Sequence, residues 1–167
     1  NEVKNFNNER LFNQLMEQYR QSTDPSYKAD LSRALTATTD GKQIKAIIEK
    51  FEDASTIKPQ DLRAWFRGLL ANAKGQQLTW DWIRNDWKWL EDTVGGDMEF
   101  NTFITVIANI FRTPARLEEF KAFFEPKLQT PGLTREITMD IKVIEGRVRL
   151  IQAEKAAVNT AIEKIIA

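Results

Sequence analysis

The feature that most constrains this chain is the spacing of its apolar residues, which recur three and four positions apart along nearly all of the sequence. Residues at this spacing lie on one face of an α-helix, so each run predicts a helix that buries one stripe and exposes the rest. Alternating patterns typical of β-strands are essentially missing. The sequence therefore predicts an all-α fold.

Start and stop signals divide these runs into separate helices. Asp24 can cap a helix that holds Pro25 in its first turn, and Thr113-Pro114 repeats the arrangement. Asp40 and Gln43 resemble a capping box. The predicted stripes are Leu11-Leu15-Tyr19, Tyr27-Leu31-Leu35, Ile44-Ile47-Phe51, Leu62-Trp65-Leu69, Trp80-Ile83-Trp87-Leu90-Val94, Phe100-Phe103-Ile107-Phe111, Leu117-Phe120-Phe124, Ile137-Ile141-Ile144-Val148-Ile151 and Ala157-Ala161-Ile165.

Two of the helix boundaries are less obvious. Thr79 is expected to cap a helix that continues to Val94, and a kink near Gln152 is expected to divide the last two helices. Eight or nine helices joined by short turns favour antiparallel hairpins stacked as a HEAT- or armadillo-like α-solenoid, with a compact helical bundle as the alternative. The length of 167 residues fits a single helical domain over residues 1–167.

Cysteine and histidine are both absent from the sequence. Their absence excludes a thiolate nucleophile, a Ser-His-Asp arrangement, a disulfide and the ordinary zinc sites. The sequence also contains no calcium-binding loop of the D-x-[DN]-x-[DN]-G type and no glycine-rich nucleotide loop. We therefore predict no catalytic, cofactor-binding or metal-binding residue in this chain, and the sequence assigns no substrate-binding residue.

Charge, hydropathy and cysteine content indicate which partners and which location to expect. Basic and acidic residues number 24 each, so the net charge is zero and no nucleic-acid partner is expected. The longest apolar stretches are far shorter than the roughly 20 residues of a membrane span, so no membrane partner is expected either. The lack of cysteine fits a reducing compartment, and we expect a cytoplasmic location.

Four of the five tryptophans, Trp80, Trp82, Trp87 and Trp89, crowd one helical segment. They could form a stacking platform for a sugar or a base. However, Trp80 and Trp87 share the helix face of the apolar residues Ile83 and Leu90, which favours packing in the core.

Charged residues suggest two further sites, a carboxylate pair and an anion-binding stripe. In each case an ordinary structural role explains the residues better. Asp81 and Asp86 could act as paired carboxylates, but five positions apart on a helix they point in different directions. Asp81 is better explained by the dipole at a helix start and Asp86 by a solvated or locally paired charge. A basic stripe could bind anions, but acidic residues interrupt it, as on a solvated helix face. The basic residues are Arg112, Arg116, Lys121, Lys127, Arg135, Lys142, Arg147 and Arg149, and the acidic ones are Glu118, Glu119, Glu125, Asp140 and Glu145.

Several short motifs follow one another in a fixed order along the chain. They are Leu15-x-x-x-Tyr19, Thr23-Asp24-Pro25 ahead of Leu35, Ile57-Lys58-Pro59-Gln60-Asp61, Asn72-x-x-Gly75, Thr79-Trp80-Asp81-Trp82-Ile83-Arg84, Phe111-x-Thr113, Leu117-Glu118-Glu119-Phe120, Phe123-Phe124, and Arg135 with Ile141, Ile144 and Ile151. Over almost its whole length the chain thereby resembles the C-terminal helical, HEAT-like domain of bacterial zinc aminopeptidases of the aminopeptidase N family. Asp86 departs from the pattern, because similar proteins often have asparagine there.

The resemblance implies that residues 1–167 are a C-terminal fragment of a larger multidomain enzyme, which agrees with a first residue, Asn1, that is not methionine. The G-x-M-E-N and H-E-x-x-H motifs of such enzymes are absent here, so the fragment is expected to be inactive alone. The parent is expected to be a metallopeptidase that releases N-terminal amino acids from peptides, with zinc in its catalytic domain.

The resemblance also implies a role for the fragment: a structural domain that covers the active site and limits which peptides enter. Its expected partners are the catalytic domain of the same polypeptide and the peptide substrates. The alternative is an independent helical-repeat adaptor that binds a protein or a peptide. Because a severed solenoid exposes a face, an apolar edge is expected near the first helix, at Phe6, Leu11, Phe12 and Leu15.

Overall fold

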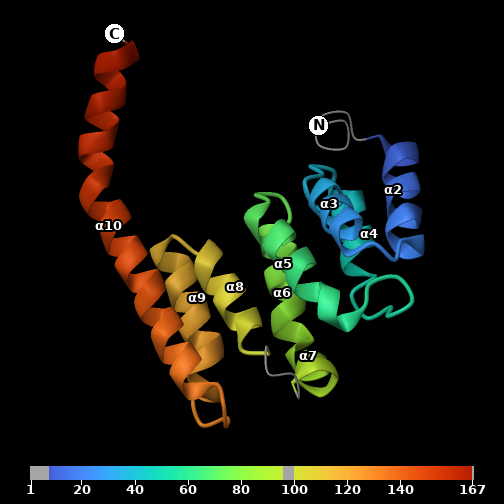
Figure 1. Ribbon diagram of the computed structural model, residues 1–167. Coiled ribbons are helices and arrows are strands. Elements are labelled where there is room, and N and C mark those ends of the chain that lie inside the picture. Colours follow the sequence, from blue (N-terminus) through green and yellow to red (C-terminus); the bar gives the residue numbers. More distant parts are fainter. Residues whose placement is uncertain (1–7, 96–99, 167) are drawn as a thin grey trace. The chain divides into compact units, whose positions relative to one another are not determined.

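A computed structural model describes residues 8–95 and 100–166 of the chain (Figure 1). In these residues the chain forms α-helices and two short 3₁₀ helices, and no strand occurs in them, so the all-α prediction is confirmed. The elements are α2 (Glu9–Gln21), α3 (Pro25–Thr36), α4 (Gly41–Ile48), η1 (Pro59–Asp61), α5 (Leu62–Ala71), α6 (Gln76–Asn85), α7 (Trp87–Val94), α8 (Thr102–Ile110), α9 (Pro114–Phe124), η2 (Glu125–Lys127) and α10 (Thr134–Ile166). They belong to two compact units, residues 1–100 and residues 101–167. The stacking as a solenoid stays a prediction.

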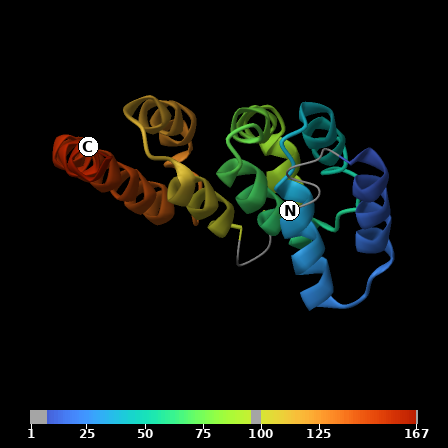
Figure 2. The same ribbon diagram turned by 90° about the horizontal axis from the view of Figure 1, so that it is seen from above.

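The first unit is built from helices that pack on their neighbours in the sequence. Helices α2 and α3 are joined by a short turn and form a hairpin (Figure 2), α3 packs on α5, and α5 packs on α6. Helix α3 approaches α5 closely at Gly68, where an added Cβ would lie 2.2 Å from Thr36 Oγ1. The glycine is therefore needed for this crossing.

The starts of α3 and α4 follow the predicted capping chemistry. Asp24 Oδ1 accepts hydrogen bonds from the backbone of Ser26 and Tyr27, at 2.8 and 3.2 Å, and Pro25 is the first residue of α3. Asp40 likewise caps α4, but the side chain of Gln43 is occupied elsewhere, because Thr38 donates a hydrogen bond of 2.5 Å to it. The Asp40 cap is confirmed, and the reciprocal bond of a capping box is replaced by one through Thr38.

The core of the first unit is aromatic and aliphatic, and its largest fully buried side chains include Trp65, Trp80 and Tyr19. Phe51, Phe66 and Trp82 pack edge to face or tilted, with ring centroids 5.0 to 5.6 Å apart. Such pairs add stability beyond the burial of their area. They fix α5 and α6 to the segment that follows α4.

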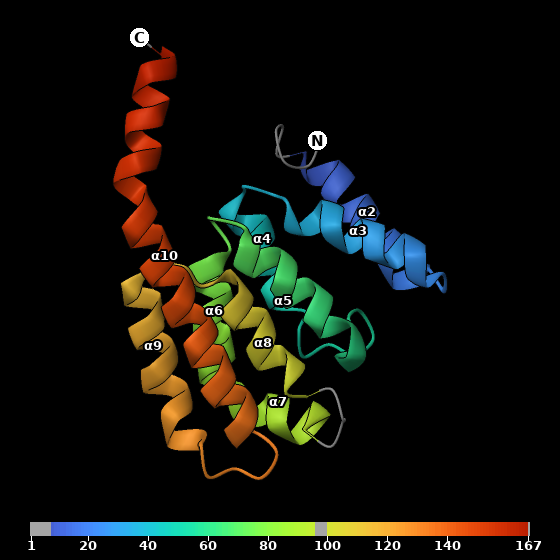
Figure 3. The same ribbon diagram turned by 60° about the vertical axis from the view of Figure 1, so that its left-hand side comes forward.

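The second unit consists of α8, α9 and the 33-residue helix α10. The first half of α10 packs on both α8 and α9, whereas its second half extends beyond them (Figure 3). Thr113 Oγ1 accepts a hydrogen bond from Arg116 N, and Pro114 begins α9, as predicted. Gly132 has a φ of 86° in the turn before α10, a left-handed conformation that suits glycine.

The structure corrects several expected boundaries. Helix α6 begins at Gln76, so Thr79 is not a cap but a fully buried residue of its second turn. The helix expected to reach Val94 is broken at Asp86, whose backbone angles of −109° and 19° are not helical. No break occurs at Gln152, because α10 continues through it.

The predicted apolar edge near the first helix is not where the exposed apolar side chains lie. Phe12 is buried, Leu11 and Leu15 are half-buried, and Phe6 lies outside the described residues. Tyr27, placed on a buried stripe, is exposed instead, and its hydroxyl donates a hydrogen bond of 2.7 Å to Gln18.

Candidate functional site

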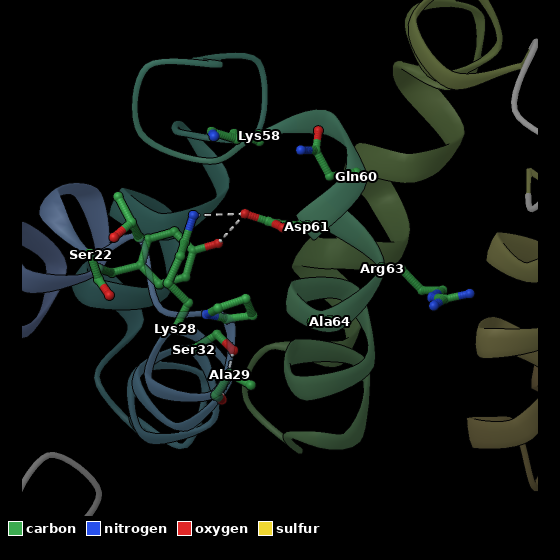
Figure 4. A pocket seen from close by; sticks show the side chains of 12 residues that line it. Ser22, Lys28, Ala29, Ser32, Lys58, Gln60, Asp61, Arg63 and Ala64 are labelled. Atoms are coloured by element: carbon green, nitrogen blue, oxygen red, sulfur yellow. Dashed lines mark hydrogen bonds and ion pairs between the residues drawn. The ribbon is translucent and has the colours of Figure 1, made fainter.

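A hollow of about 370 Å³ lies in the first unit, where the end of α2, the start of α3 and the segment around η1 meet (Figure 4). Most of the side chains in its walls are polar or charged. The lining residues are Tyr19, Ser22, Thr23, Pro25, Lys28, Ala29, Ser32, Lys58, Gln60, Asp61, Arg63 and Ala64. Two of the motifs that carry the family resemblance, Leu15-x-x-x-Tyr19 and Ile57 to Asp61, come together here.

The centre of this site is the carboxylate of Asp61. Its Oδ2 accepts a hydrogen bond of 3.0 Å from the Tyr19 hydroxyl and forms an ion pair of 2.8 Å with Lys28 Nζ. The Tyr19 oxygen in turn accepts a hydrogen bond of 3.0 Å from Trp65 Nε1, and Lys28 Nζ lies 4.4 Å from the centre of the Tyr19 ring. In Figure 4, Lys28 reaches Asp61, whereas Arg63 points away from it. We call Tyr19, Lys28, Asp61 and Trp65 the Tyr19 network.

The environment keeps Tyr19 in its neutral form. Burial raises the pKa of the Tyr19 phenol well above its ordinary value, the hydrogen bond from Trp65 opposes this shift, and the negative charge of Asp61 adds to it. The hydroxyl therefore remains a donor to Asp61, and the charge of Asp61 is balanced by Lys28. This arrangement can hold helices together or bind a polar group at the rim, but it presents no activated nucleophile.

A second polar cluster, in the second unit, brings together two carboxylates that sequence reasoning did not pair. Thr105 Oγ1 lies 2.6 Å from Glu136 Oε1 and 3.2 Å from Asp140 Oδ2, and Asp140 is buried between α8 and α10. Burial first, and then the charge of Glu136, raise the pKa of Asp140 to about 6. The only sequence signal was an acidic residue on the apolar stripe of α10, next to Ile137, Ile141 and Ile144.

The tryptophans lie where the core-packing interpretation placed them. Trp80 and Trp87 are buried, which confirms the prediction for both. Trp82 and Trp89 are half-buried and pack on each other with ring centroids 5.9 Å apart. A flat stacking platform for a ligand is therefore not formed by these rings.

Asp81 and Asp86 are not brought together as a catalytic pair. Asp81 forms an ion pair with Arg84 and accepts a hydrogen bond of 2.8 Å from Gln77 Nε2. It lies in the middle of α6, so the expectation that it answers the dipole at a helix start is wrong. Asp86 occupies the junction between α6 and α7, and its backbone N–H donates a hydrogen bond of 2.8 Å to Trp82 O.

Several of the basic residues between positions 112 and 149 are engaged in local contacts. Arg116 pairs with Glu119 at 2.7 Å and Lys121 with Glu145 at 2.6 Å. Arg147 Nη1 donates to the backbone oxygens of Ala108 and Phe111, at 2.6 and 2.9 Å. These contacts agree with a paired helical surface rather than an open anion-binding stripe.

Within residues 8–95 and 100–166, no three histidine, cysteine, aspartate or glutamate side chains are grouped as a metal site would require. None of the described helices is both long enough and apolar enough to cross a membrane.

Comparison with known proteins identifies the family. The model of the ERAP1-like C-terminal domain matches residues 2–146. Aminopeptidase N of Lactobacillus helveticus is 61% identical over 166 residues, which are 99% of this chain and 20% of that protein. Aminopeptidase N of Lactobacillus delbrueckii subsp. lactis is 51% identical over 97% of this chain, and glutamyl aminopeptidase of Mus musculus is 28% identical over 73% of it.

The chain thus spans about a fifth of the length of the bacterial relatives that it matches. The family match covers far more than half of the chain and agrees with the resemblance carried by the sequence motifs. The chain belongs to the ERAP1-like C-terminal domain family.

Proposed function

We propose that this chain is the C-terminal structural and substrate-gating domain of a zinc-dependent aminopeptidase. The observation that carries the proposal is the match of almost the whole chain to one fifth of proteins named aminopeptidase N. In this proposal residues 1–167 form a single helical domain of a longer, cytoplasmic polypeptide. The remaining part of that polypeptide binds zinc and releases N-terminal amino acids from peptides.

The residue content supports the proposal that the catalytic chemistry lies outside residues 1–167. The sequence has no histidine, so it supplies neither ligand of an H-E-x-x-H zinc motif. Asp61, the central carboxylate of the hollow, is balanced by Lys28 and held by Tyr19. A covering domain needs a stable shape and a polar surface, and it needs no nucleophile of its own.

The activity is tested on the full-length protein with aminoacyl chromogenic substrates. We expect release of the N-terminal residue, loss of activity with a chelator and recovery on addition of zinc. Residues 1–167 expressed alone, free of host peptidases, are expected to be inactive. A full-length reading frame without an H-E-x-x-H motif, or a full-length protein without activity, would instead favour the independent adaptor. An unchanged rate in the chelator would refute the zinc dependence.

Gating is tested separately by the length of the substrate. A domain that limits entry should discriminate peptides by length, so kcat/KM of the full-length enzyme is expected to depend on peptide length even when the first residues are identical. Deleting the domain is expected to weaken that dependence while the catalytic part still binds zinc. Retention of the full length dependence in a truncated protein that still binds zinc would refute gating.

A further inference from the structure

The exposed apolar surface of the described residues is concentrated on one helix. Nine large apolar side chains are exposed in this part of the chain, and all except Tyr27 belong to α10. They are Met139, Val143, Leu150, Ile151, Val158, Ile162, Ile165 and Ile166. Where such side chains form one continuous surface, that surface marks a contact with another apolar surface.

Four of these residues continue the face by which α10 already packs on its own unit. Ile137, Ile144 and Val148 are buried, and Ile151 follows Val148 by three positions. The same steps of seven, four and three positions then lead from Ile151 to Val158, Ile162 and Ile165. We call Ile151, Val158, Ile162 and Ile165 the distal stripe.

The first half of this continuous face is covered and the second half is not. Helices α8 and α9 pack on the first half, whereas Ile151, Val158, Ile162 and Ile165 are 41, 51, 47 and 83% exposed. Isolated helices of this length are marginal in water, so a helix with an apolar stripe is normally stabilised by packing that stripe. The continuity of spacing indicates that the distal stripe is a packing surface as well.

The charges around the distal stripe narrow the kind of partner. Glu154, Lys155, Glu163 and Lys164 balance one another, so this half of α10 has no excess of cations. Helices that lie on membrane surfaces are typically rich in lysine and arginine, and nucleic-acid contacts need a positive surface. A protein surface is therefore the fitting partner.

The size of the stripe argues against a second copy of this chain. Residues 151–166 of a helix span about 24 Å, and a strip about 10 Å wide gives roughly 500 Å² over both partners. Stable interfaces between separate proteins bury about 1,200–2,000 Å². So small a contact is effective mainly within one polypeptide, where the local concentration of the two surfaces is high.

We propose that the distal stripe docks on an apolar face of the same polypeptide, in the part that lies outside residues 1–167. This inference rests on the proposed function, which makes the chain one domain of a longer protein. Lys155 lies in the stripe between Ile151 and Val158. We expect a carboxylate on the docking face to pair with the Lys155 ammonium group. This ion pair would fix the position of the helix along that face.

The surface that the distal stripe contacts is identified by photo-cross-linking in the full-length protein, with benzoylphenylalanine in place of Ile162. Ala156, exposed and on the opposite side of the helix from Val158, is the matched control position. We expect adducts from position 162 that join it to residues outside 1–167 of the same molecule, and few from position 156. Adducts to residues 1–133, adducts between two molecules, or equal yields at both positions would each overturn the proposal.

A second measurement does not depend on the photochemistry. In the full-length protein, Ile162→Glu is expected to raise the amide exchange rates of residues 151–166 about 10- to 100-fold, as expected for the loss of one buried isoleucine. Ala156→Glu adds the same charge and is expected to change these rates little. Equal effects of the two substitutions would contradict docking.

These results separate the inference from the proposed function. Position-specific adducts in a protein without aminopeptidase activity would support docking and refute the proposed function. An active zinc aminopeptidase whose distal stripe gives no adducts above the control would refute docking and leave the proposed function in place.

Discussion

The hydroxyl of Tyr19 donates a hydrogen bond of 3.0 Å to Asp61 Oδ2, which joins α2 to η1 across 42 positions of the sequence. The same Asp61 oxygen pairs with Lys28 on α3. One carboxylate oxygen thus connects three elements of the first unit. The oxygen of the same hydroxyl accepts a hydrogen bond from Trp65 Nε1. Both Tyr19 and Trp65 are almost fully buried.

Tyr19→Phe is expected to destabilise the chain, because it removes the donor to Asp61 and leaves Trp65 Nε1 without its acceptor. A buried polar group without a partner costs about 1–3 kcal/mol. The free energy of unfolding is measured in urea. Tyr27→Phe is the control, since it removes an exposed hydroxyl bonded to Gln18, and it should change stability by less than about 0.5 kcal/mol. If Tyr19→Phe changed stability as little as Tyr27→Phe, the network would add no stability.

Local sequence signals predicted most of the fold, because capping chemistry acts within a few residues. Asp24-Pro25 and Thr113-Pro114 begin helices as their types require. The break at Asp86 was missed because no glycine or proline marks it and tertiary packing decides it. The Tyr19 network was also missed, since it joins positions far apart in the sequence. Composition alone supported the absence of catalytic chemistry, which stays a prediction.

Gly68→Ala is expected to destabilise the packing of α3 on α5. A Cβ at this position would lie 2.2 Å from Thr36 Oγ1 and 2.6 Å from Thr36 Cβ, so one helix must shift. Overpacking of this kind typically costs about 1–3 kcal/mol. The change is read as a lower midpoint of thermal unfolding.

Gly146→Ala is the matched control for Gly68→Ala. Gly146 lies inside α10, and an added Cβ there meets no atom within 4 Å. Alanine favours a helix interior over glycine by about 0.5–1 kcal/mol, so this substitution should stabilise the chain. Destabilisation of similar size at both positions would point to a general intolerance of alanine rather than to the close contact with Thr36.

Asp140→Asn is expected to remove a pH dependence of stability. Burial and the charge of Glu136 raise the pKa of Asp140 to about 6 in the folded chain, against about 3.9 when unfolded. The folded state therefore binds the proton more tightly, so stability is greatest below the unfolded pKa and falls as the pH rises through 6. The loss is on the order of 3 kcal/mol. The charge that acts on Asp140 is that of Glu136, and the neutral hydroxyl of Thr105, on α8, donates hydrogen bonds to both carboxylates.

The measurement is urea unfolding between pH 4 and pH 7.5. The difference in stability between Asp140→Asn and the unmodified chain should change across pH 4–6 and favour the variant at pH 7. Asp53 gives stability a pH dependence of the opposite sign, because hydrogen bonds from Ser55 and Thr56 lower its pKa to about 2. Its contribution is present above pH 4 and is lost as the pH falls. A pH-independent difference for Asp140→Asn would contradict the raised pKa.

Arg147→Met is expected to loosen the contact between α10 and the end of α8. Arg147 Nη1 donates to the carbonyl oxygens of Ala108 and Phe111, where the last turn of α8 leaves carbonyls without partners inside the helix. Hydrogen bonds from a charged donor contribute about 1.5–3 kcal/mol, and methionine keeps the aliphatic length without the donor. Arg147→Lys retains a charged donor and should recover part of the loss. Arg149→Met, at an exposed neighbouring position, is the control and should have little effect. If lysine were no better than methionine in urea unfolding, the packing of the side chain rather than its hydrogen bonds would carry the stability, as expected when a long side chain covers apolar surface.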